Sequence, residues 1–244
     1  MNEVTDDIAK LPTAWHMAGS ISVAVLRAIE RHAAKLGPLT YSVETGCGKS
    51  TLLLSHLSQH HVVFTMGNPD NDDSHLKVLG SPLLNSNTVE WVYGPTQRTL
   101  PAYPFPERIQ LALIDGPHGY PFPQMEYWAL YPRLCTGALL VVDDIQIPTI
   151  YQLFLFLKED AMFSLTDVVE TTAFFMRTEA PLFDPFADGW WLQAYNARGN
   201  LVLDLSVDLR PSASSRVRQY IRRYIPAPAK RLARMLLRTG QSAR

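Results

Sequence analysis

The segment from Glu44 to Thr51, with the sequence ETGCGKST, places two glycines between an apolar strand and the start of a predicted helix. Its end matches a phosphate-binding P-loop, which requires a further glycine five residues before the one that precedes the lysine. That position is occupied by Val43. Two glycines after a strand also suit a nucleoside cofactor, because they let the backbone approach a ligand closely and a carboxylate at the strand end can accept hydrogen bonds from it. The loop alone leaves both kinds of site open.

Acidic residues close three of the predicted strands: Glu44 the first, Asp115 the fourth, and Asp143 with Asp144 the fifth. Ligands bind at the carboxyl ends of strands in an open parallel sheet, so these carboxylates converge on one crevice if the three strands are neighbours. Two unit charges about 4 Å apart repel by about 4 kcal/mol at an effective dielectric constant of about 20. A divalent cation with oxygen ligands, such as Mg²⁺, would relieve this repulsion. The alternative is that Asp115 and Asp143 only cap the turns and helices that follow them.

The apolar pattern alternates between strands and helices along most of the chain. Helices are expected at 20–36, from the glycine loop to residue 57, at 123–134 and at 149–159, and strands at 40–45, 61–65, 88–93, 110–114 and 138–142. This alternation is typical of a Rossmann-like, doubly wound α/β fold with a mostly parallel sheet. Two later runs, 168–177 and 190–195, are expected to complete a seven-stranded sheet with an antiparallel edge. Cys135 is assigned to the end of the helix predicted over 123–134.

The 244 residues divide into three predicted parts. Residues 1–37 form an N-terminal helical segment, in which Trp15 and His16 are either lid or structural residues. Residues 38–210 form the ligand-binding domain, and residues 211–244 form a basic tail. The tail has nine basic and no acidic residues, which gives it a charge of +9. The rest of the chain therefore has a charge of −10, and the whole chain a net charge of −1. Its amphipathic helical pattern suits an anionic membrane surface, whereas a solvated chain end is the alternative.

Several classes of protein are disfavoured by composition. No stretch reaches the ~18 apolar residues of a membrane span, and the acidic N-terminus does not resemble a signal peptide. The two cysteines give no disulfide framework. We therefore expect a cytoplasmic protein, whose tail is the candidate for contact with the inner membrane face. Nucleic acid is not an expected partner, because no aromatic interleaving or known binding motif accompanies the basic residues. Self-association into a homo-oligomer is left open.

Three motifs in order extend the reading of the glycine loop: E-x-G-x-G-x-S-T from Glu44, IDG-x-H-x-Y around Asp115, and L-x-x-G-x-x-x-x-x-DD ending at Asp144. Together they resemble the class I S-adenosylmethionine-dependent methyltransferases, over residues 38–160. Within that class they are similar to metal-dependent O-methyltransferases that modify sugar hydroxyls. The resemblance implies that Asp115, Asp143 and Asp144 hold a divalent cation.

The resemblance also implies the cofactor and catalytic residues. The expected S-adenosylmethionine contacts are Glu44, Gly46, Cys47, Gly48, Ser50, Thr51, Asn68, Asp70, Thr96, Gln97 and Asp115. Asp115, His118 and Asp144 are the expected catalytic residues. His118 is the candidate general base, because an imidazole with a pKa of about 6.5 suits proton removal from a hydroxyl near neutral pH. Asp115 is the other candidate.

The chain departs from the family pattern at three points. One is the DG motif, which is often followed by another acid, where Pro117 and His118 stand here. The usual acidic residue directly after the second strand, which grips the ribose, is replaced by Met66 and Gly67, and Asn68 or Asp70 would have to serve. Lys49 in the glycine loop does little for a positively charged sulfonium.

The sequence thus predicts an S-adenosylmethionine-dependent O-methyltransferase that acts on a hydroxyl of a small molecule, sugar or glycan. One alternative is a non-catalytic cofactor-binding protein of the same fold. A P-loop-like NTPase is the weaker alternative, since the IDG-x-H-x-Y block has no role in a P-loop site. Aromatic residues near this block could stack on a sugar face, although helical spacing makes Tyr127 and Tyr131 more typical of a core.

Overall fold

The computed structural model describes residues 3–12, 21–67, 73–105 and 108–197. The chain divides into two units, Met1–Asn196 and Ala197–Arg244. Some predictions fall outside the described residues: the lid candidates Trp15 and His16, the ribose candidates Asn68 and Asp70, and the basic tail 211–244.

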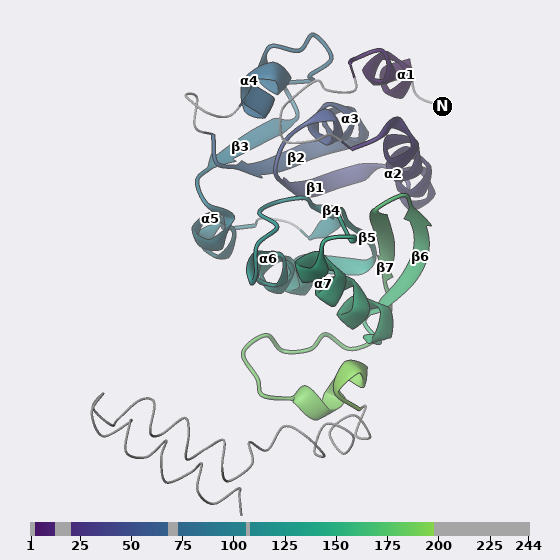
Figure 1. Cartoon of the computed structure of the whole chain (residues 1–244), viewed down its shortest axis with the longest axis vertical. Coiled ribbons are helices and arrows are strands. Elements are labelled where there is room, and N and C mark those ends of the chain that lie inside the picture. The colour runs from purple at the N-terminus through teal and green to yellow at the C-terminus, as the bar shows by residue number, and fades with distance from the viewer. Residues whose placement is uncertain (1–2, 13–20, 68–72, 106–107, 198–244) are drawn as a thin grey trace, which may run out of the picture. The chain divides into compact units, whose positions relative to one another are not determined.

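A seven-stranded sheet forms the centre of the first unit (Figure 1). Its strands are β1 Leu39–Thr45, β2 Ser58–Thr65, β3 Val89–Tyr93, β4 Ile109–Ile114, β5 Leu134–Val142, β6 Phe163–Val169 and β7 Thr172–Arg177. Their order is β3-β2-β1-β4-β5-β7-β6, with β1 to β5 parallel and β7 antiparallel to both of its neighbours. The Rossmann-like fold and its antiparallel edge are confirmed. The strands that end at Glu44–Thr45, Ile114 and Val142 are neighbours, which meets the condition for their terminal acids to converge.

Helices cover both faces of the sheet (Figure 1). They are α1 Glu3–Ala9, α2 Val23–Leu36, α3 Lys49–Leu57, α4 Asp73–Leu79, α5 Thr96–Ala102, α6 Phe122–Leu130 and α7 Pro148–Glu159. α1 to α4 lie on one side of the sheet and α5 to α7 on the other. The sheet alternates its apolar side chains between the two layers: Val43, Ala112 and Leu140 pack toward α6 and α7, while Leu111 and Leu139 pack toward α2 and α3. Strands buried on both faces explain the near-continuous apolar runs in the sequence.

Some predicted elements differ from the observed ones. The helix predicted over 123–134 is too long, because α6 ends at Leu130 and a 3₁₀ turn, Tyr131–Arg133, leads directly into β5. Pro132 lies in that turn, where its missing N–H cannot continue an α-helix. Cys135 therefore lies in β5, and its assignment to the helix is wrong.

The antiparallel edge is a hairpin of β6 and β7, whereas the sequence predicted strands at 168–177 and 190–195. The run 168–177 spans the turn between β6 and β7. The strand predicted at 190–195 is wrong, because that segment forms the 3₁₀ turns Trp190–Leu192 and Ala194–Ala197. The sequence reading also missed α4 and α5, whose seven residues each are too few for a clear helical period. Within the part of the chain that the structure describes, no helix has both the length and the apolar character needed to cross a membrane.

Candidate active site at the carboxyl ends of the strands

The glycine loop and the loop after β4 are in direct contact. Gly46 adopts a φ of 85°, and a Cβ atom there would clash with the backbone carbonyl oxygen of Asp115. The side-chain oxygen of Thr45 accepts a hydrogen bond from the Asp115 backbone N–H at 3.1 Å. Only glycine combines this positive φ with the close approach of a second backbone. The first and second motifs therefore form one continuous surface.

The larger of two adjoining pockets has a volume of about 390 Å³. It is lined by Gly46, Cys47, Phe64, Thr65, Met66, Ser74, Gly94, Pro95, Thr96, Gln97, Asp115, Gly116, Pro117 and His118. The loops after β1, β2, β3 and β4 thus all contribute. Sequence reasoning named residues in all four loops, but those after β2, Asn68 and Asp70, lie outside the described residues. It missed the end of β2, at Phe64 to Met66, and Ser74 on α4. The strand end could have been found from its place in the parallel sheet, whereas Ser74 carried no signal.

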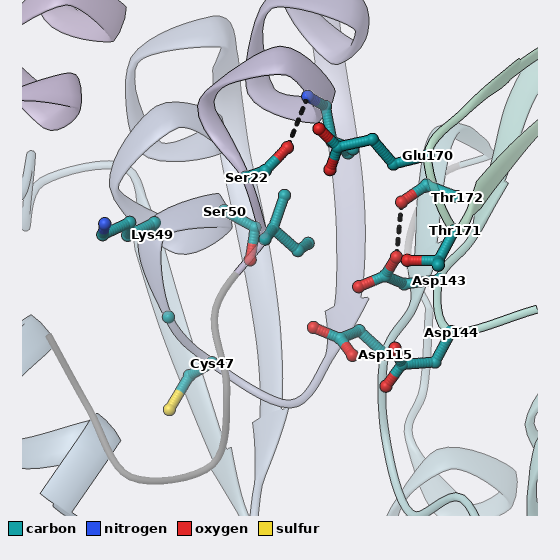
Figure 2. Close-up of a pocket in the computed structure, with 13 residues that line it drawn as sticks. Ser22, Cys47, Lys49, Ser50, Asp115, Asp143, Asp144, Glu170, Thr171 and Thr172 are labelled. Carbon is teal, nitrogen blue, oxygen red and sulfur yellow. Dashed lines mark hydrogen bonds between the residues drawn. The ribbon is translucent and has the colours of Figure 1, made fainter. Parts of the chain in front are cut away.

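The second pocket, here called the acidic pocket, has a volume of about 140 Å³. Its lining includes the predicted residues Cys47, Gly48, Ser50, Asp115, Asp143 and Asp144. Glu170, from the turn between β6 and β7, adds a fourth acidic side chain. Cys47 and Asp115 line both pockets, so the two are neighbours. Figure 2 shows Asp115, Asp143 and Asp144 gathered at the ends of β4 and β5.

Asp115, His118 and Asp144 form the cluster that is suited to a metal ion, with one ligand atom from each lying within 4.8 Å of the others. His118 Nε2 lies 3.2 Å from Asp144 Oδ2 and 3.8 Å from Asp115 Oδ1. The sequence prediction named Asp143 in place of His118. Asp143 instead accepts a hydrogen bond from the Thr172 hydroxyl on β7 (Figure 2). Two carboxylates and an imidazole are a common ligand set for divalent transition metals, while Mg²⁺ prefers oxygen alone.

Asp144 has an unusual backbone for a residue with a side chain, because its φ is 57°. Non-glycine residues in this left-handed region are uncommon, and they occur often at functional sites. Its side chain also accepts a hydrogen bond from Gln146 Nε2 at 2.7 Å. The two adjacent aspartates consequently make different contacts, Asp143 with β7 and Asp144 with the loop after β4.

The crowded acids alter the protonation of the site. Burial raises the pKa of Asp115 to about 7, and the charges of Asp143 and Asp144 add to this while His118 opposes it. The Asp115 carboxylate in turn raises the pKa of His118, whose side chain is 41% exposed. Burial also raises the pKa of Asp143. Protons therefore compete for this cluster near neutral pH, which suits groups that exchange protons with a ligand.

Glu126 on α6 is a buried carboxylate behind the larger pocket that sequence reasoning missed. It is 2% exposed and accepts hydrogen bonds from Thr45 Oγ1 at 2.9 Å and from Thr96 Oγ1 at 2.6 Å. A Cβ atom at Gly116 would clash with its carboxylate. Burial raises the pKa of Glu126 to about 7. One side chain thus joins the loops after β1, β3 and β4.

Glu44 lines neither pocket, since its side chain is fully buried beneath the glycine loop. It accepts a hydrogen bond from the Thr51 hydroxyl, and its Oε1 lies 3.2 Å from His61 Nε2. Thr51 Oγ1 also accepts from the Gly48 backbone N–H at 3.0 Å. In this arrangement Glu44 and Thr51 hold the shape of the loop rather than face a pocket.

Lys49 lines the acidic pocket, but its amine does not face the carboxylates there. Its amine donates to the carbonyl oxygen of Pro12 at 3.0 Å and is directed away from the carboxylates (Figure 2). Burial lowers its pKa. In a P-loop the equivalent lysine reaches the β- and γ-phosphates. The direction of the Lys49 amine therefore argues against a nucleoside triphosphate site at this loop.

In comparison with known proteins, residues 43–145 match the model of a methyltransferase domain. The fold is similar to that of the O-methyltransferase TomG from Streptomyces achromogenes, solved in complex with SAM (S-adenosylmethionine), with a TM-score of 0.56 and 15% identity over 73% of this chain and 91% of that one. It is also similar to an O-methyltransferase from Bacillus cereus, solved in complex with SAH (S-adenosylhomocysteine), with a TM-score of 0.53 and 17% identity over 73% and 92% of the two chains. No curated protein sequence matches the chain.

Proposed function

We propose that the chain is an S-adenosylmethionine-dependent methyltransferase, which transfers the cofactor's methyl group to a hydroxyl oxygen of a sugar or glycan. The match of residues 43–145 to a methyltransferase domain supports this. The observation that carries this proposal is the shared wall between the two pockets. Asp115 belongs both to the larger pocket, which has the size of a typical ligand site, and to the acidic pocket. A cofactor bound along this wall brings its reactive methyl group beside the cluster of Asp115, His118 and Asp144.

The adenosine part of the cofactor would occupy the larger pocket. Gln97 is the polar side chain from the β3 loop that could bond the adenine edge there. The Thr96 hydroxyl already donates to Glu126, so it keeps only acceptor capacity for a ligand. Gly46 lets the backbone approach the cofactor closely. The acidic pocket would favour the positively charged sulfonium, because four carboxylate residues line it and Lys49 points elsewhere.

The reaction would be an in-line displacement. The acceptor oxygen forms a bond to the methyl carbon while the carbon–sulfur bond breaks. The electron pair of the broken carbon–sulfur bond stays on sulfur, which gives S-adenosylhomocysteine with a neutral sulfur. The hydroxyl proton passes to His118 Nε2 or to an Asp115 oxygen, whose raised pKa values make both able to accept a proton near neutral pH. The remaining contribution of the protein is positioning of the two reactants.

A divalent cation would be held by Asp115, His118 and Asp144 rather than by the three aspartates predicted from the sequence. The donor set of two carboxylates and one imidazole fits Mn²⁺, Fe²⁺ or Zn²⁺ better than Mg²⁺. When bound, such an ion lowers the cost of deprotonating a hydroxyl. The reaction above does not depend on it.

Calorimetric titration with S-adenosylhomocysteine tests the cofactor assignment, with ATP and Mg²⁺ as the comparison ligand. We expect binding of the first and none of the second, and weaker binding in Gln97→Ala but not in the control Gln152→Ala. Transfer of a labelled methyl group from S-adenosylmethionine to glycosides then tests the acceptor. Binding of ATP alone would overturn the proposal, and cofactor binding without transfer to any hydroxyl would favour a non-catalytic protein.

A further inference from the structure

A third cavity, here called the aromatic pocket, lies between α6, α7 and the segment 183–195, and it has a volume of about 330 Å³. It shares no lining residue with the larger pocket or the acidic pocket. Its volume falls within the usual range of small-molecule sites, which are apolar cavities with a few placed polar groups. The proposed methyl transfer does not use it.

The outer wall of the aromatic pocket is fixed to the helices by specific contacts. Tyr131 donates its hydroxyl hydrogen to the carbonyl oxygen of Phe183 at 2.9 Å, and Trp128 Nε1 donates to that of Pro185 at 3.3 Å. The ring centroids of Phe156, on α7, and Tyr195 lie 5.5 Å apart. These contacts hold the segment 183–195 over α6 and α7 and keep the cavity formed.

A buried hydroxyl in this lining has no partner among the described residues. Tyr127 is 7% exposed, and its hydroxyl makes no hydrogen bond there. Gln124 Oε1 is also buried without a partner, although its amide nitrogen donates to the Thr149 carbonyl at 2.9 Å. Buried polar atoms are normally paired, so unpaired ones at a cavity wall indicate that something else supplies the partner.

Two further unpaired atoms lie behind the same wall. Asp160 Oδ2 and Arg177 Nε are buried without a hydrogen-bond partner among the described residues, and both residues interact electrostatically with Tyr127. Burial raises the pKa of Tyr127 well above its ordinary value, so its hydroxyl keeps its proton and can donate it.

The lining of the aromatic pocket selects the chemistry of its ligand. No charged residue lines it, which disfavours phosphates, carboxylates and amines as ligands. Its polar groups are uncharged tyrosine hydroxyls and glutamine amides, from Gln124, Gln152 and Gln193 among others. Aromatic faces pack against the apolar face of a ring, and several amides and hydroxyls around them match a ligand that carries many hydroxyl groups. A purely aromatic ligand would leave the Tyr127 hydroxyl and Gln124 Oε1 unpaired, which is costly in a buried site.

We propose that the aromatic pocket is a second binding site, separate from the methyl-transfer site, for a neutral sugar ring. The hydroxyl groups of the ring would bond to lining residues, namely Tyr127, Gln124, Gln152 and Gln193. The site requires neither cofactor nor methyl transfer, so it stands independently of the proposed function.

Fluorescence of the full chain, titrated with the methyl glycosides and trisaccharides of glucose, galactose, mannose and N-acetylglucosamine, tests the proposal through Trp128. We expect saturable quenching by at least one of these sugars at millimolar concentration or below, with and without S-adenosylhomocysteine. Tyr127→Phe removes only the hydroxyl and should weaken binding about tenfold. The same change should leave the melting temperature equal or higher, because an unpaired buried hydroxyl does not stabilise the fold.

Two variants control the experiment. Tyr103→Phe removes another partly buried hydroxyl, one that donates to Glu90 far from this pocket, and should leave sugar binding unchanged. Gln193→Ala changes a lining residue outside the helices and should weaken binding without loss of folding, as judged by an unchanged affinity for S-adenosylhomocysteine. Absence of saturable binding by every sugar, or binding of a neutral phenol such as methyl 4-hydroxybenzoate but of no sugar, would overturn the proposal.

Discussion

Thr96 donates a hydrogen bond to Glu126 at 2.6 Å, although the two residues are 30 positions apart and lie in different helices. The same carboxylate accepts from Thr45, whose hydroxyl oxygen in turn accepts from the backbone of Asp115. The larger pocket is therefore shaped by one acid that never lines it. This relationship makes Glu126 the first residue to test outside the pocket walls.

Glu126→Gln should change how stability depends on pH. The pKa of Glu126 is raised from an unfolded value of 4.5 to about 7, so the folded state binds its proton more tightly. Its contribution is fully present below pH 4.5 and is lost as pH rises to about 7, and the loss is of order 3 kcal/mol. Urea unfolding at several pH values across this window should show a falling free energy of unfolding in the native protein relative to Glu126→Gln. Parallel curves would contradict the burial of an ionisable Glu126.

Gly46→Ala should destabilise the protein and abolish cofactor binding. The new Cβ would meet the Asp115 carbonyl oxygen, and the φ of 85° is already unfavourable for alanine. Gly37→Ala is a matched control, since Gly37 has a φ of 79° but nothing within 4 Å of the added Cβ. We expect a cost of about 1 kcal/mol at Gly37, from backbone strain alone, and several-fold more at Gly46. Urea unfolding and S-adenosylhomocysteine titration measure the two effects, and equal costs would mean that the contact between the loops is not tight.

Asp144→Asn should reduce methyl transfer by about a hundredfold or more while leaving S-adenosylhomocysteine affinity within a few-fold. Asp144 lies against His118 and lines the acidic pocket, not the larger one. Glu170→Gln removes a charge from the same pocket without touching the cluster, and it should retain most activity. Retained activity in Asp144→Asn, with Asp115→Asn also active, would remove the cluster from the mechanism.

Metal affinity should show whether His118, as in the structure, or Asp143, as predicted from the sequence, is the third metal ligand beside Asp115 and Asp144. Titration with Mn²⁺, followed by electron paramagnetic resonance, should show binding weakened by about tenfold or more in His118→Ala. Asp143→Asn should have a smaller effect, because Asp143 is already engaged by Thr172. The opposite ranking would restore Asp143 as a ligand.

Methyl transfer should increase as pH rises through about 7. The pKa of Asp115 is raised to about 7 and that of His118 is raised as well, so both carry protons in mildly acidic solution. A group that must accept the hydroxyl proton works only after losing its own, and activity is therefore lost as pH falls. The two groups interact, so the profile reports the pair. Rates at saturating cofactor across this range, compared with those of His118→Gln, test the assignment; a flat profile would exclude both bases.

The predicted and observed structures agree most closely where the signal is local. Strand period, glycine turns and strand-end acids can each be read within a few residues, and they predicted the five parallel strands, whereas the adjacency of β1, β4 and β5 came from the structure. Predictions failed where a proline or a short segment decided the outcome, as at Pro132 and in the turns of Trp190–Leu192.

The sequence by itself determined which residue types stand at the carboxyl ends of the strands, because chain order and strand period are local properties. Only the tertiary structure decided which of those side chains meet. Asp143 and Asp144 are adjacent in the chain, yet one bonds Thr172 and the other lies against His118, since a positive φ at Asp144 and a hairpin 29 residues away set their contacts. Glu126 acquires its partners, and the amine of Lys49 turns to the Pro12 carbonyl, through packing between distant segments that no local pattern records.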